Sequence, residues 1–362
     1  MVDPAFWKGK RVLVTGHTGF KGGWLSLWLG KLGSRVTGFA QPPSTNPSLY
    51  ELASVSASAE SNFGDIRSAA EVLSCMRSCE PEIVFHLAAQ PLVRESYGDP
   101  IGTYMTNVMG TAHVLEAARS TSTVKVVVVV TSDKCYEPWD EPAVHRESDP
   151  MGGYDPYSSS KGCAELVAAA YRRSFFEAAG IRLATARAGN VIGGGDWAQD
   201  RLLPDCVNAI LEHRVLRLRS PQAVRPWQHV MDALGGYLVL AEKLSESPAF
   251  AGSYNFGPAS GDVATVSEVI GRFVRLWGEP AQIETDEVGA QLHETGFLAL
   301  DSLRARVALG WRPRLRLEEA LEFTAAWYRG YSDGLDLRAL TLAQIAAFGE
   351  KLGDSERRAA LA

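Results

Sequence analysis

The 362-residue chain is poor in cysteine, and its cysteines do not form a metal-binding pattern. There are five, an odd number, and Cys75 and Cys79 lie four residues apart in a segment of helical period. No second pair of this kind and no nearby histidine cluster completes a zinc site. We therefore expect reduced packing thiols and no metal ion. Cys135 has no partnering base of the usual kind, so we interpret it as lining a site.

Long apolar runs and excess positive charge are also missing. No run approaches the about 20 residues that cross a bilayer, and the N-terminal stretch "MVDPAFWKGK" lacks the apolar core of a signal peptide. These two absences predict a cytoplasmic protein without a membrane partner. A nucleic-acid surface needs a basic face, and the formal net charge of −6 argues against one. The composition, 46% hydrophobic and 22% charged, is that of a soluble globular protein.

Apolar runs of strand length alternate with segments of helical period through the first half of the chain. The expected strands are 11–16, 35–40, 62–66, 82–89, 126–130 and 182–191, and the main expected helices are 22–33, 69–79, 101–119 and 157–179. This alternation, with continuously apolar strands, predicts an α/β fold: a doubly wound, Rossmann-like parallel sheet. After about residue 190 the alternation dissolves. We predict a cofactor domain over 1–186, with a return segment near 227–256, and a smaller mixed substrate domain with a helical tail over 187–362.

Three glycines lie between the first expected strand and the first expected helix. Gly16, Gly19 and Gly22 are spaced by three in "TGHTGFKGG". Glycine at these positions lets the backbone turn tightly and lets a pyrophosphate approach the helix N-terminus. The placement predicts a dinucleotide site, with a plain tight turn as the alternative. Lys21 is unusual in such a turn, and it is either solvated or in contact with the pyrophosphate.

The second expected strand lacks the acidic residue that usually holds a ribose hydroxyl. Gln41 stands near that position, and the segment 36–66 contains no lysine or arginine that could meet a 2′-phosphate. Asp65 is well placed to bond the adenine amino group. Together these residues favour NAD over NADP.

Tyr157 and Lys161 are four residues apart in an expected helix and therefore share one face. A phenol has a pKa of about 10 and is a poor base at neutral pH. A neighbouring ammonium favours the phenolate and lowers that pKa. Tyr157 could then accept a hydroxyl proton as a hydride leaves. In isolation, such a pair on a helix usually has no catalytic function. Its combination with the glycine turn favours the functional interpretation.

An acid and a base, Asp133 and Lys134, follow the valine run 126–130. They are either a surface ion pair that caps the strand or a proton donor and a proton acceptor. The two residues alone do not distinguish between these interpretations.

Taken together, these motifs resemble the extended short-chain dehydrogenase/reductases, and among them the nucleotide-sugar 4,6-dehydratases. The resemblance runs from Lys10 to about Tyr328, and its specificity lies in the order and spacing of the strings "TGHTGFKGG", "GDI", "HLAAQ", "TNVMGT", "SDK", the Tyr157–Lys161 pair and "RAGNVIGGGDW". Two strings, "GHTGFKGGWLSLWL" and "GGGDWAQDRLLPD", are most similar to the branch of the family that acts on CDP-glucose.

The resemblance implies a three-stage reaction that returns the cofactor unchanged. NAD oxidises C4 of the sugar with Tyr157 as base, water leaves across C5 and C6, and the hydride returns to C6. Ser132 would bond the C4 oxygen, and protonated Asp133 would protonate the departing C6 hydroxyl. Lys134 would take the C5 proton, although the wider family most often has Thr-Asp-Glu here. A lysine base needs a pKa well below about 10.4, lowered by burial or by Lys161.

The resemblance also assigns binding residues and partners. The implied NAD site comprises Gly16, His17, Thr18, Gly19, Phe20, Lys21, Gly22, Asp65, Ile66, Leu87, Ala88, Ala89, Gln90, Asn107, Tyr157 and Lys161. The implied substrate site comprises Arg94, Ser96, Ser132, Asn190, Trp197, Arg201, Leu202, Leu218, Arg219, Arg225 and His229. Each of the arginines could instead be a solvated surface charge, and His229 could be a core residue. Family members commonly form homodimers or homotetramers.

Two rival functions remain. A related NAD-dependent enzyme, such as a nucleotide-sugar 4-epimerase or a dehydratase for another nucleotide-linked hexose, would share most of the motifs. An epimerase, however, has no use for the donor–acceptor pair after the valine run. A non-catalytic nucleotide-sensing protein could dispense with Tyr157 and Lys161.

Overall fold

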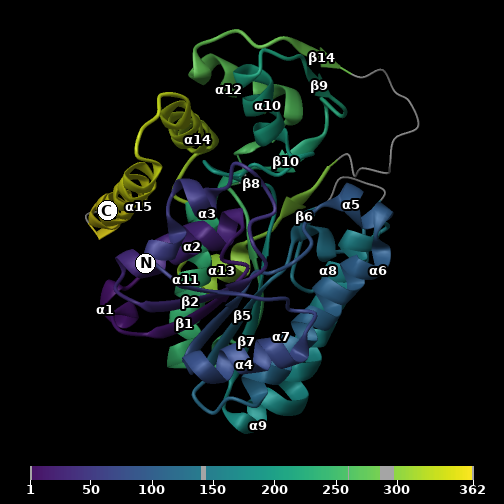
Figure 1. Ribbon diagram of the computed structural model, residues 1–362, viewed down its shortest axis with the longest axis vertical. Helices are drawn as coiled ribbons and strands as arrows, with labels where there is room; N and C mark the ends of the chain where they lie inside the picture. Colours follow the sequence, from purple (N-terminus) through teal and green to yellow (C-terminus); the bar gives the residue numbers. More distant parts are fainter. Residues whose placement is uncertain (1, 140–143, 260, 286–296, 361–362) are drawn as a thin grey trace.

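A seven-stranded parallel sheet forms the centre of the molecule (Figure 1). The computed structural model describes residues 2–139, 144–259, 261–285 and 297–360. The strands of the sheet are β1 (Arg11–Thr15), β2 (Arg35–Ala40), β3 (Glu60–Phe63), β4 (Ile83–His86), β5 (Val126–Val130), β7 (Arg182–Ala188) and β12 (Gly252–Phe256). Their order is β3-β2-β1-β4-β5-β7-β12. The strand order reverses between β1 and β4, which is where open sheets of this kind bind ligands.

Helices cover both faces of the sheet, as the apolar strands require. One face carries α2 (Phe20–Lys31) and α11 (Val230–Glu246), and the other carries α4 (Ala69–Cys79), α7 (Gly110–Arg119) and α8 (Pro156–Tyr171). The residues of β5 alternate between two separate hydrophobic cores: Val126, Val128 and Val130 face one, and Val127 and Val129 face the other. The predicted doubly wound, Rossmann-like class is confirmed.

The helix ends follow local capping chemistry. The Ser68 side chain caps α4 by accepting from the Glu71 amide, and the Asp155 side chain caps α8 by accepting from the Ser158 amide. Pro156 occupies the first position of α8, where its missing amide hydrogen costs nothing. Capping therefore sets where α8 begins, and Tyr157 lies in its first turn.

The second half of the chain builds a cap over the carboxyl ends of the strands (Figure 1). We define the cap by α10 (Leu202–Leu211), β9 (Leu216–Leu218), β10 (Val224–Pro226), β13 (Val263–Thr265), α12 (Val266–Trp277), β14 (Ile283–Thr285) and α14 (Leu317–Ser332). Between β10 and β13 the chain returns to the sheet through α11 and β12. The cap is thus assembled from two separate lengths of chain.

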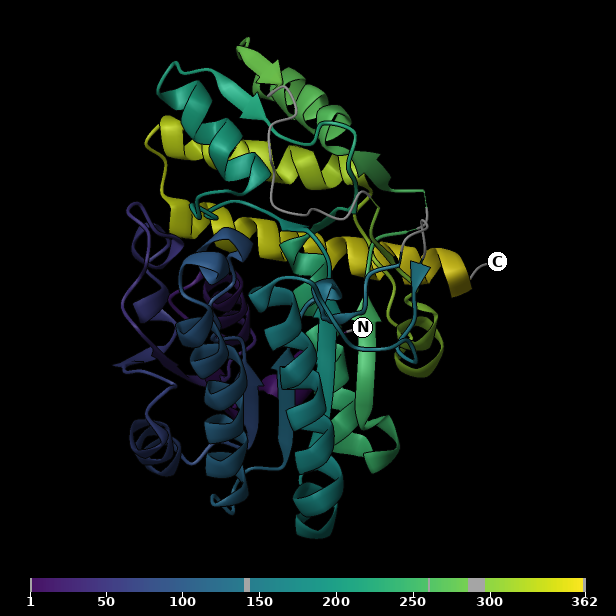
Figure 2. The same cartoon turned by 90° about the vertical axis from the view of Figure 1, so that its right-hand side faces the viewer.

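The helical tail packs against the rest of the fold. α15 (Leu337–Ala360) contacts α14 and α2, and the rings of Phe348 and Trp28 meet edge to face at 5.6 Å. Figure 2 shows α15 crossing between the sheet and the cap. None of the helices within the described ranges combines the length and the hydropathy that crossing a bilayer requires.

Short elements complete the fold. They are α1 (Pro4–Trp7), α3 (Leu49–Leu52), α5 (Val93–Gly98), α6 (Pro100–Tyr104), β6 (Val144–His145), α9 (Glu177–Ala179), β8 (Val191–Ile192), β11 (Gln228–His229), β15 (Ala299–Leu300) and α13 (Leu303–Leu309).

Several expected elements differ in the structure: the fourth strand spans Ile83–His86 rather than 82–89, and the strand expected at 182–191 ends at Ala188. The third strand ends at Phe63 rather than Ile66, so Asp65 lies in the following turn. The expected helix 101–119 contains a π-helical turn over Met105–Met109, and the expected helix 157–179 contains another over Arg172–Phe176. A hydrophobic pattern of helical period does not distinguish a π turn from an α turn.

Candidate active site

A cleft of about 1350 Å³ lies between the carboxyl edge of the sheet and the cap. It extends from the glycine turn after β1 to α10 and β9. Sites for single drug-sized ligands are typically about 300–1000 Å³. The cleft is therefore large enough for two ligands, such as a dinucleotide and a nucleotide sugar.

The glycine turn brings β1 and the start of α2 into direct contact. Gly16 has a φ of 78°, and a Cβ on Gly22 would lie 2.1 Å from the Gly16 carbonyl oxygen. Glycine at these positions is therefore a steric requirement. Gly16, Thr18, Gly19, Phe20, Lys21 and Gly22 all line the cleft. The turn fits a pyrophosphate because the N-terminus of α2 lies on the cleft wall.

His17, expected among the cofactor residues, is buried behind the turn. Its Nε2 lies 3.0 Å from the Ser61 hydroxyl, and its ring covers Gly38 so closely that a Cβ there would lie 2.2 Å from the ring. Burial lowers the pKa of His17 to about 4. The side chain is thus a neutral packing group at neutral pH.

Gln41, Asp65 and Arg67 form a hydrogen-bonded cluster at the edge of the cleft. The Asp65 carboxylate accepts from Gln41 Nε2 at 2.9 Å and from Arg67 Nη2 at 2.6 Å. This arginine and its hydrogen bond to Asp65 hold the pKa of the carboxyl below its usual range. Arg67 was missed by the sequence argument because it lies one residue beyond the segment searched for positive charge. Its charge is paired with Asp65.

Lys21 lies on the wall of the cleft, close enough to the charged groups of Arg201, Asp133, Lys161 and Asp196 to interact with them. Burial lowers its pKa to about 8, with further lowering by Arg201 and Lys161 and opposing effects of Asp133 and Asp196. The lowered pKa favours contact with the pyrophosphate over solvation, and this role of Lys21 stays a prediction.

Tyr157 and Lys161 both line the cleft from α8. The Ser96 hydroxyl, expected to face the sugar, instead accepts from the Tyr157 amide at 3.2 Å and so braces the start of the helix. Burial raises the pKa of Tyr157 to about 12, while a hydrogen bond with Ser132 opposes the rise. The expected lowering by Lys161 was wrong, because burial outweighs the nearby positive charge. Burial also lowers the pKa of Lys161 to about 8.

Ser132, Asp133 and Lys134 form the start of a short 3₁₀ turn after β5, and we call this segment the SDK turn. The Ser132 hydroxyl donates to Asp133 Oδ1 at 2.9 Å, and Asp133 Oδ2 has no hydrogen-bond partner. Asp133 is buried, and burial raises its pKa against the opposing charges of Lys134, Arg225 and Lys21. A carboxyl group with a raised pKa is suited to donate a proton.

The loop after β4 contributes Leu87, Ala88, Ala89 and Gln90 to the cleft wall. Asn107 holds this loop in place: its amide donates to the Gln90 carbonyl at 3.0 Å and to the Ser160 hydroxyl at 2.8 Å. Asn107 therefore links the loop to α8, while Asp65 and Ile66 line the cleft nearby.

The expected substrate residues divide into three groups. Trp197 and Arg201 line the cleft, and Arg201 is paired with Asp196 at 2.9 Å. Arg94 and Arg219 converge on Asp200, at 3.6 Å and 2.7 Å. The others are not among the lining residues of the cleft: Leu218, Arg225 and His229 are buried, and Asn190 and Leu202 are half-buried.

His229 caps α11 and packs edge to face on Trp24 and Phe323. Burial lowers its pKa to about 3. The structure therefore favours the core interpretation of this histidine. Leu216 and Arg217, neighbours of the expected Leu218 and Arg219, line the cleft. They were missed because the resemblance placed this contact two residues further along the chain.

Comparison with known proteins points to one family. The family model described as GDP-mannose 4,6 dehydratase matches residues 13–324. The CDP-glucose 4,6-dehydratase of Salmonella typhimurium is 48% identical over 354 residues, which cover 96% of this chain and 98% of that protein.

Two solved structures of similar proteins contain NAD. The dTDP-glucose 4,6-dehydratase of Streptomyces venezuelae is 26% identical with a TM-score of 0.74, covering 90% of this chain and 98% of that one. MoeE5 in complex with UDP-glucose and NAD is 25% identical with a TM-score of 0.76, and the match covers 89% of this chain and 99% of that chain.

Proposed function

The chain belongs to the GDP-mannose 4,6 dehydratase family, and from this premise we propose that it converts CDP-glucose to CDP-4-keto-6-deoxyglucose and water. The observation that carries the proposal is the buried SDK turn. Asp133, with its raised pKa, is joined through Ser132 to Tyr157. A simple dehydrogenase or a 4-epimerase needs no second acid beside the tyrosine.

NAD is the proposed cofactor, and when bound it supplies the hydride acceptor for C4 and the hydride donor for C6. The glycine turn would hold its pyrophosphate, and Asp65 with Gln41 would meet the adenosine. Leu87, Ala88 and Ala89 line the wall between the glycine turn and Tyr157. Lys161 would bond the nicotinamide ribose.

The protein's own residues would move the protons. Ser132 and Tyr157 would bond the C4 hydroxyl, and Tyr157 would accept its proton. The pKa of Tyr157, about 12, means that the phenolate forms only transiently. Positive charge on Lys161 and Lys21 beside the cleft would stabilise it. Asp133 would donate a proton to the departing C6 hydroxyl. Lys134 would accept the C5 proton and would return it to C5 when the hydride reaches C6.

CDP-glucose is proposed over other nucleotide sugars because of the 48% identity to the Salmonella typhimurium enzyme across nearly the whole of both chains. Arg201, Trp197 and Arg217 line the far end of the cleft and would surround the nucleotide. Arginine provides paired donors that suit phosphate oxygens.

The direct test offers CDP-, dTDP-, GDP- and UDP-linked glucose with NAD. We expect a 4-keto-6-deoxy product from CDP-glucose without build-up of NADH, and deuterium placed at C4 should appear at C6. Asp133→Asn and Lys134→Met should retain C4 oxidation while losing elimination. Steady NADH release by the wild-type protein, or unchanged product formation by both variants, would contradict the proposal.

A homodimer is proposed as the assembly. α6, α8 and their neighbours expose apolar side chains on the outside of the sheet domain, including Ile101, 72% exposed, and Leu166, 61% exposed. We propose that these side chains take part in the dimer interface. Leu166→Asp should lower the mass measured by light scattering to that of a monomer, whereas Leu335→Asp, at another exposed leucine, should not.

The proposed location is the cytoplasm. All five cysteines are free, as expected for a protein kept in a reducing compartment.

A further inference from the structure

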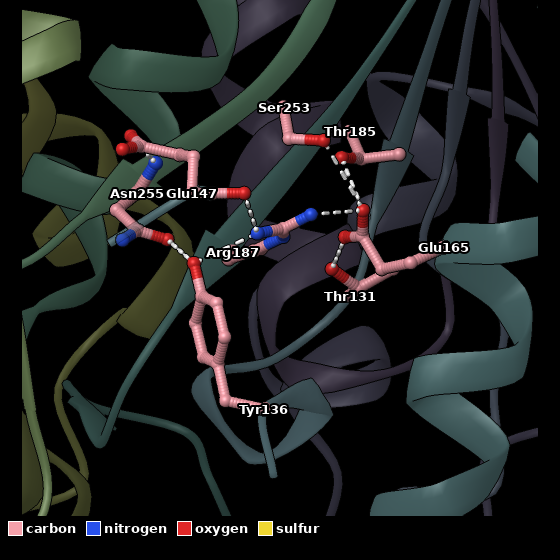
Figure 3. Close-up of polar contacts among 8 residues, drawn as sticks. All are labelled: Thr131, Tyr136, Glu147, Glu165, Thr185, Arg187, Ser253 and Asn255. Atoms are coloured by element: carbon pink, nitrogen blue, oxygen red, sulfur yellow. Dashed lines mark hydrogen bonds and ion pairs between the residues drawn. The ribbon is translucent and has the colours of Figure 1, made fainter. Parts of the chain in front are cut away.

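A buried ion pair joins the helix of Tyr157 and Lys161 to the centre of the sheet. Arg187 Nη2, at the end of β7, donates to Glu165 Oε2 on α8 at 2.7 Å. The two side chains are only 4% and 3% exposed. Figure 3 shows the pair at the centre of a network of polar side chains. None of the steps proposed above uses either charge.

The Glu165 carboxylate accepts hydrogen bonds from three neighbouring segments of the sheet. Thr131, the residue between β5 and Ser132, donates to Glu165 Oε1 at 2.5 Å. Thr185 on β7 donates to Oε2 at 2.7 Å, and Ser253 on β12 donates to the same oxygen at 3.4 Å. One carboxylate thus connects α8 to three neighbouring strands of the sheet (Figure 3).

The Arg187 guanidinium binds the other end of the SDK turn. Arg187 Nη1 donates to the Tyr136 hydroxyl at 2.8 Å, and that hydroxyl donates to Asn255 Oδ1 at 2.6 Å. Thr131 precedes Ser132 and Tyr136 follows Cys135. The two charges therefore hold the SDK turn at both of its ends.

Glu165 also lies at the right place on α8. Residues 157, 161 and 165 are spaced by four and share one face of the helix. A displacement of Glu165 relative to β5 would thus move the phenol and the ammonium relative to the SDK turn. Buried ion pairs contribute little to net stability because desolvation offsets their attraction, but breaking one is costly. Their best-attested benefit is a unique arrangement.

We propose that the Glu165–Arg187 pair is a positioning element that keeps the SDK turn in register with Tyr157 and Lys161. This inference rests on the proposed dehydratase function. Oxidation at C4 uses Tyr157 and Lys161, which lie on one helix, and from the SDK turn it uses only Ser132. Elimination also needs Asp133 and Lys134, which lie on a separate segment. Loosening the link should therefore slow elimination more than oxidation.

Two threonines provide a matched test. Thr131→Val and Thr185→Val each remove one buried hydroxyl that donates to Glu165, but only Thr131 adjoins the SDK turn. For Thr131→Val we expect kcat for product formation to fall about tenfold or more, because small misplacements of reacting groups have effects of this size. The rate of NADH formation in a single turnover should fall less, so enzyme-bound NADH should accumulate. Thr185→Val should keep the wild-type ratio of the two rates, and Thr131→Ser, which retains the hydroxyl, should restore product formation.

The melting temperatures of the two valine variants separate positioning from folding. We expect similar decreases in Tm with different kinetics. Equal loss of oxidation and elimination in Thr131→Val, or the same kinetic profile in both valine variants, would overturn the inference. If the wild-type protein forms no 4-keto-6-deoxy product, the proposed function fails first and this inference with it.

Discussion

The carboxylate of Asp133 faces the backbone of Gly189, and a Cβ at residue 189 would lie 2.9 Å from Asp133 Oδ2. The same Cβ would lie 2.6 Å from the Pro226 side chain. Asp133 Oδ2 is buried and has no hydrogen-bond partner among the described residues, and the absence of a side chain at Gly189 leaves room for it. The loop after β7 thus helps to place the proposed proton donor.

Gly189→Ala should displace Asp133 without changing any ionisable group. We expect kcat for product formation to fall about tenfold to hundredfold, as small displacements of catalytic groups do, while NAD affinity stays the same. The measurement is steady-state kinetics together with calorimetric titration of NAD. Gly98→Ala is the control, because a Cβ there meets nothing within 4 Å. Equal activity of the two variants would argue against the placement of Asp133 by Gly189.

Gly22→Ala should weaken NAD binding. The added Cβ would lie 2.1 Å from the Gly16 carbonyl oxygen, so the start of α2 must move away from the turn. We expect the dissociation constant for NAD to rise at least about tenfold, which corresponds to about 1.4 kcal/mol. Calorimetric titration measures the constant, and circular dichroism checks that the variant is folded. An unchanged constant would show that the pyrophosphate does not use this turn.

Asp65→Asn should change the preference between the two dinucleotides. At present the Arg67 guanidinium is paired with Asp65 at 2.6 Å. Removal of the Asp65 charge would leave the Arg67 guanidinium without its carboxylate partner. In the proposed binding mode this guanidinium lies beside the adenosine, where a 2′-phosphate would be. We expect the ratio of NADP to NAD affinity to rise about tenfold, the scale of one charge-assisted contact. The double variant Asp65→Asn, Arg67→Ala should abolish the rise, and its persistence there would exclude Arg67 as the cause.

Asp232 should make stability depend on pH. It is buried in the first turn of α11, accepts from the amides of Arg314 and Leu315, and burial raises its pKa to about 7 from 3.8. The folded state therefore holds the Asp232 proton more tightly than the unfolded state. The contribution of this proton to the free energy of unfolding is full below about pH 3.8 and is lost as the pH rises through about 7. Urea unfolding of the wild type and Asp232→Asn should show a difference in unfolding free energy that falls by about 1.4 kcal/mol per pH unit in this window. A constant difference would contradict the raised pKa.

The sheet domain was predictable because its signals are local and repeated. β1, β4 and β5 are apolar runs, whereas β3 (Glu60–Phe63) and β12 (Gly252–Phe256) are not, and the reversal of strand order follows from connection rules. The glycine turn and the Tyr157–Lys161 pair are likewise local, because each consists of residues only a few positions apart in the sequence. The residues of the cap that line the cleft were less predictable. The cap has short strands, and the face that each strand exposes depends on partners that are distant in sequence. Leu216 and Arg217 line the cleft, whereas the expected Leu218 and Arg219 are not among its lining residues.

Burial decided the remaining differences, and burial is a property of the folded chain. The pKa of Tyr157 rises because desolvation exceeds the effect of nearby cations. His17 and His229 are packing groups because aromatic rings surround them. Glu165 and Arg187 are 22 residues apart and meet only because α8 packs against β7. No spacing rule connects these two residues, so the sequence alone offered no signal of their contact.

The late return of β12 has a consequence for synthesis on the ribosome. This strand pairs with β7 along five residues, yet about a third of the cap precedes it in the chain. Until residue 256 has left the exit tunnel, β7 presents an unpaired backbone edge, the kind of surface that recruits neighbouring nascent chains. A premature stop anywhere between residues 189 and 251 should therefore yield an aggregating fragment that chaperones must retain.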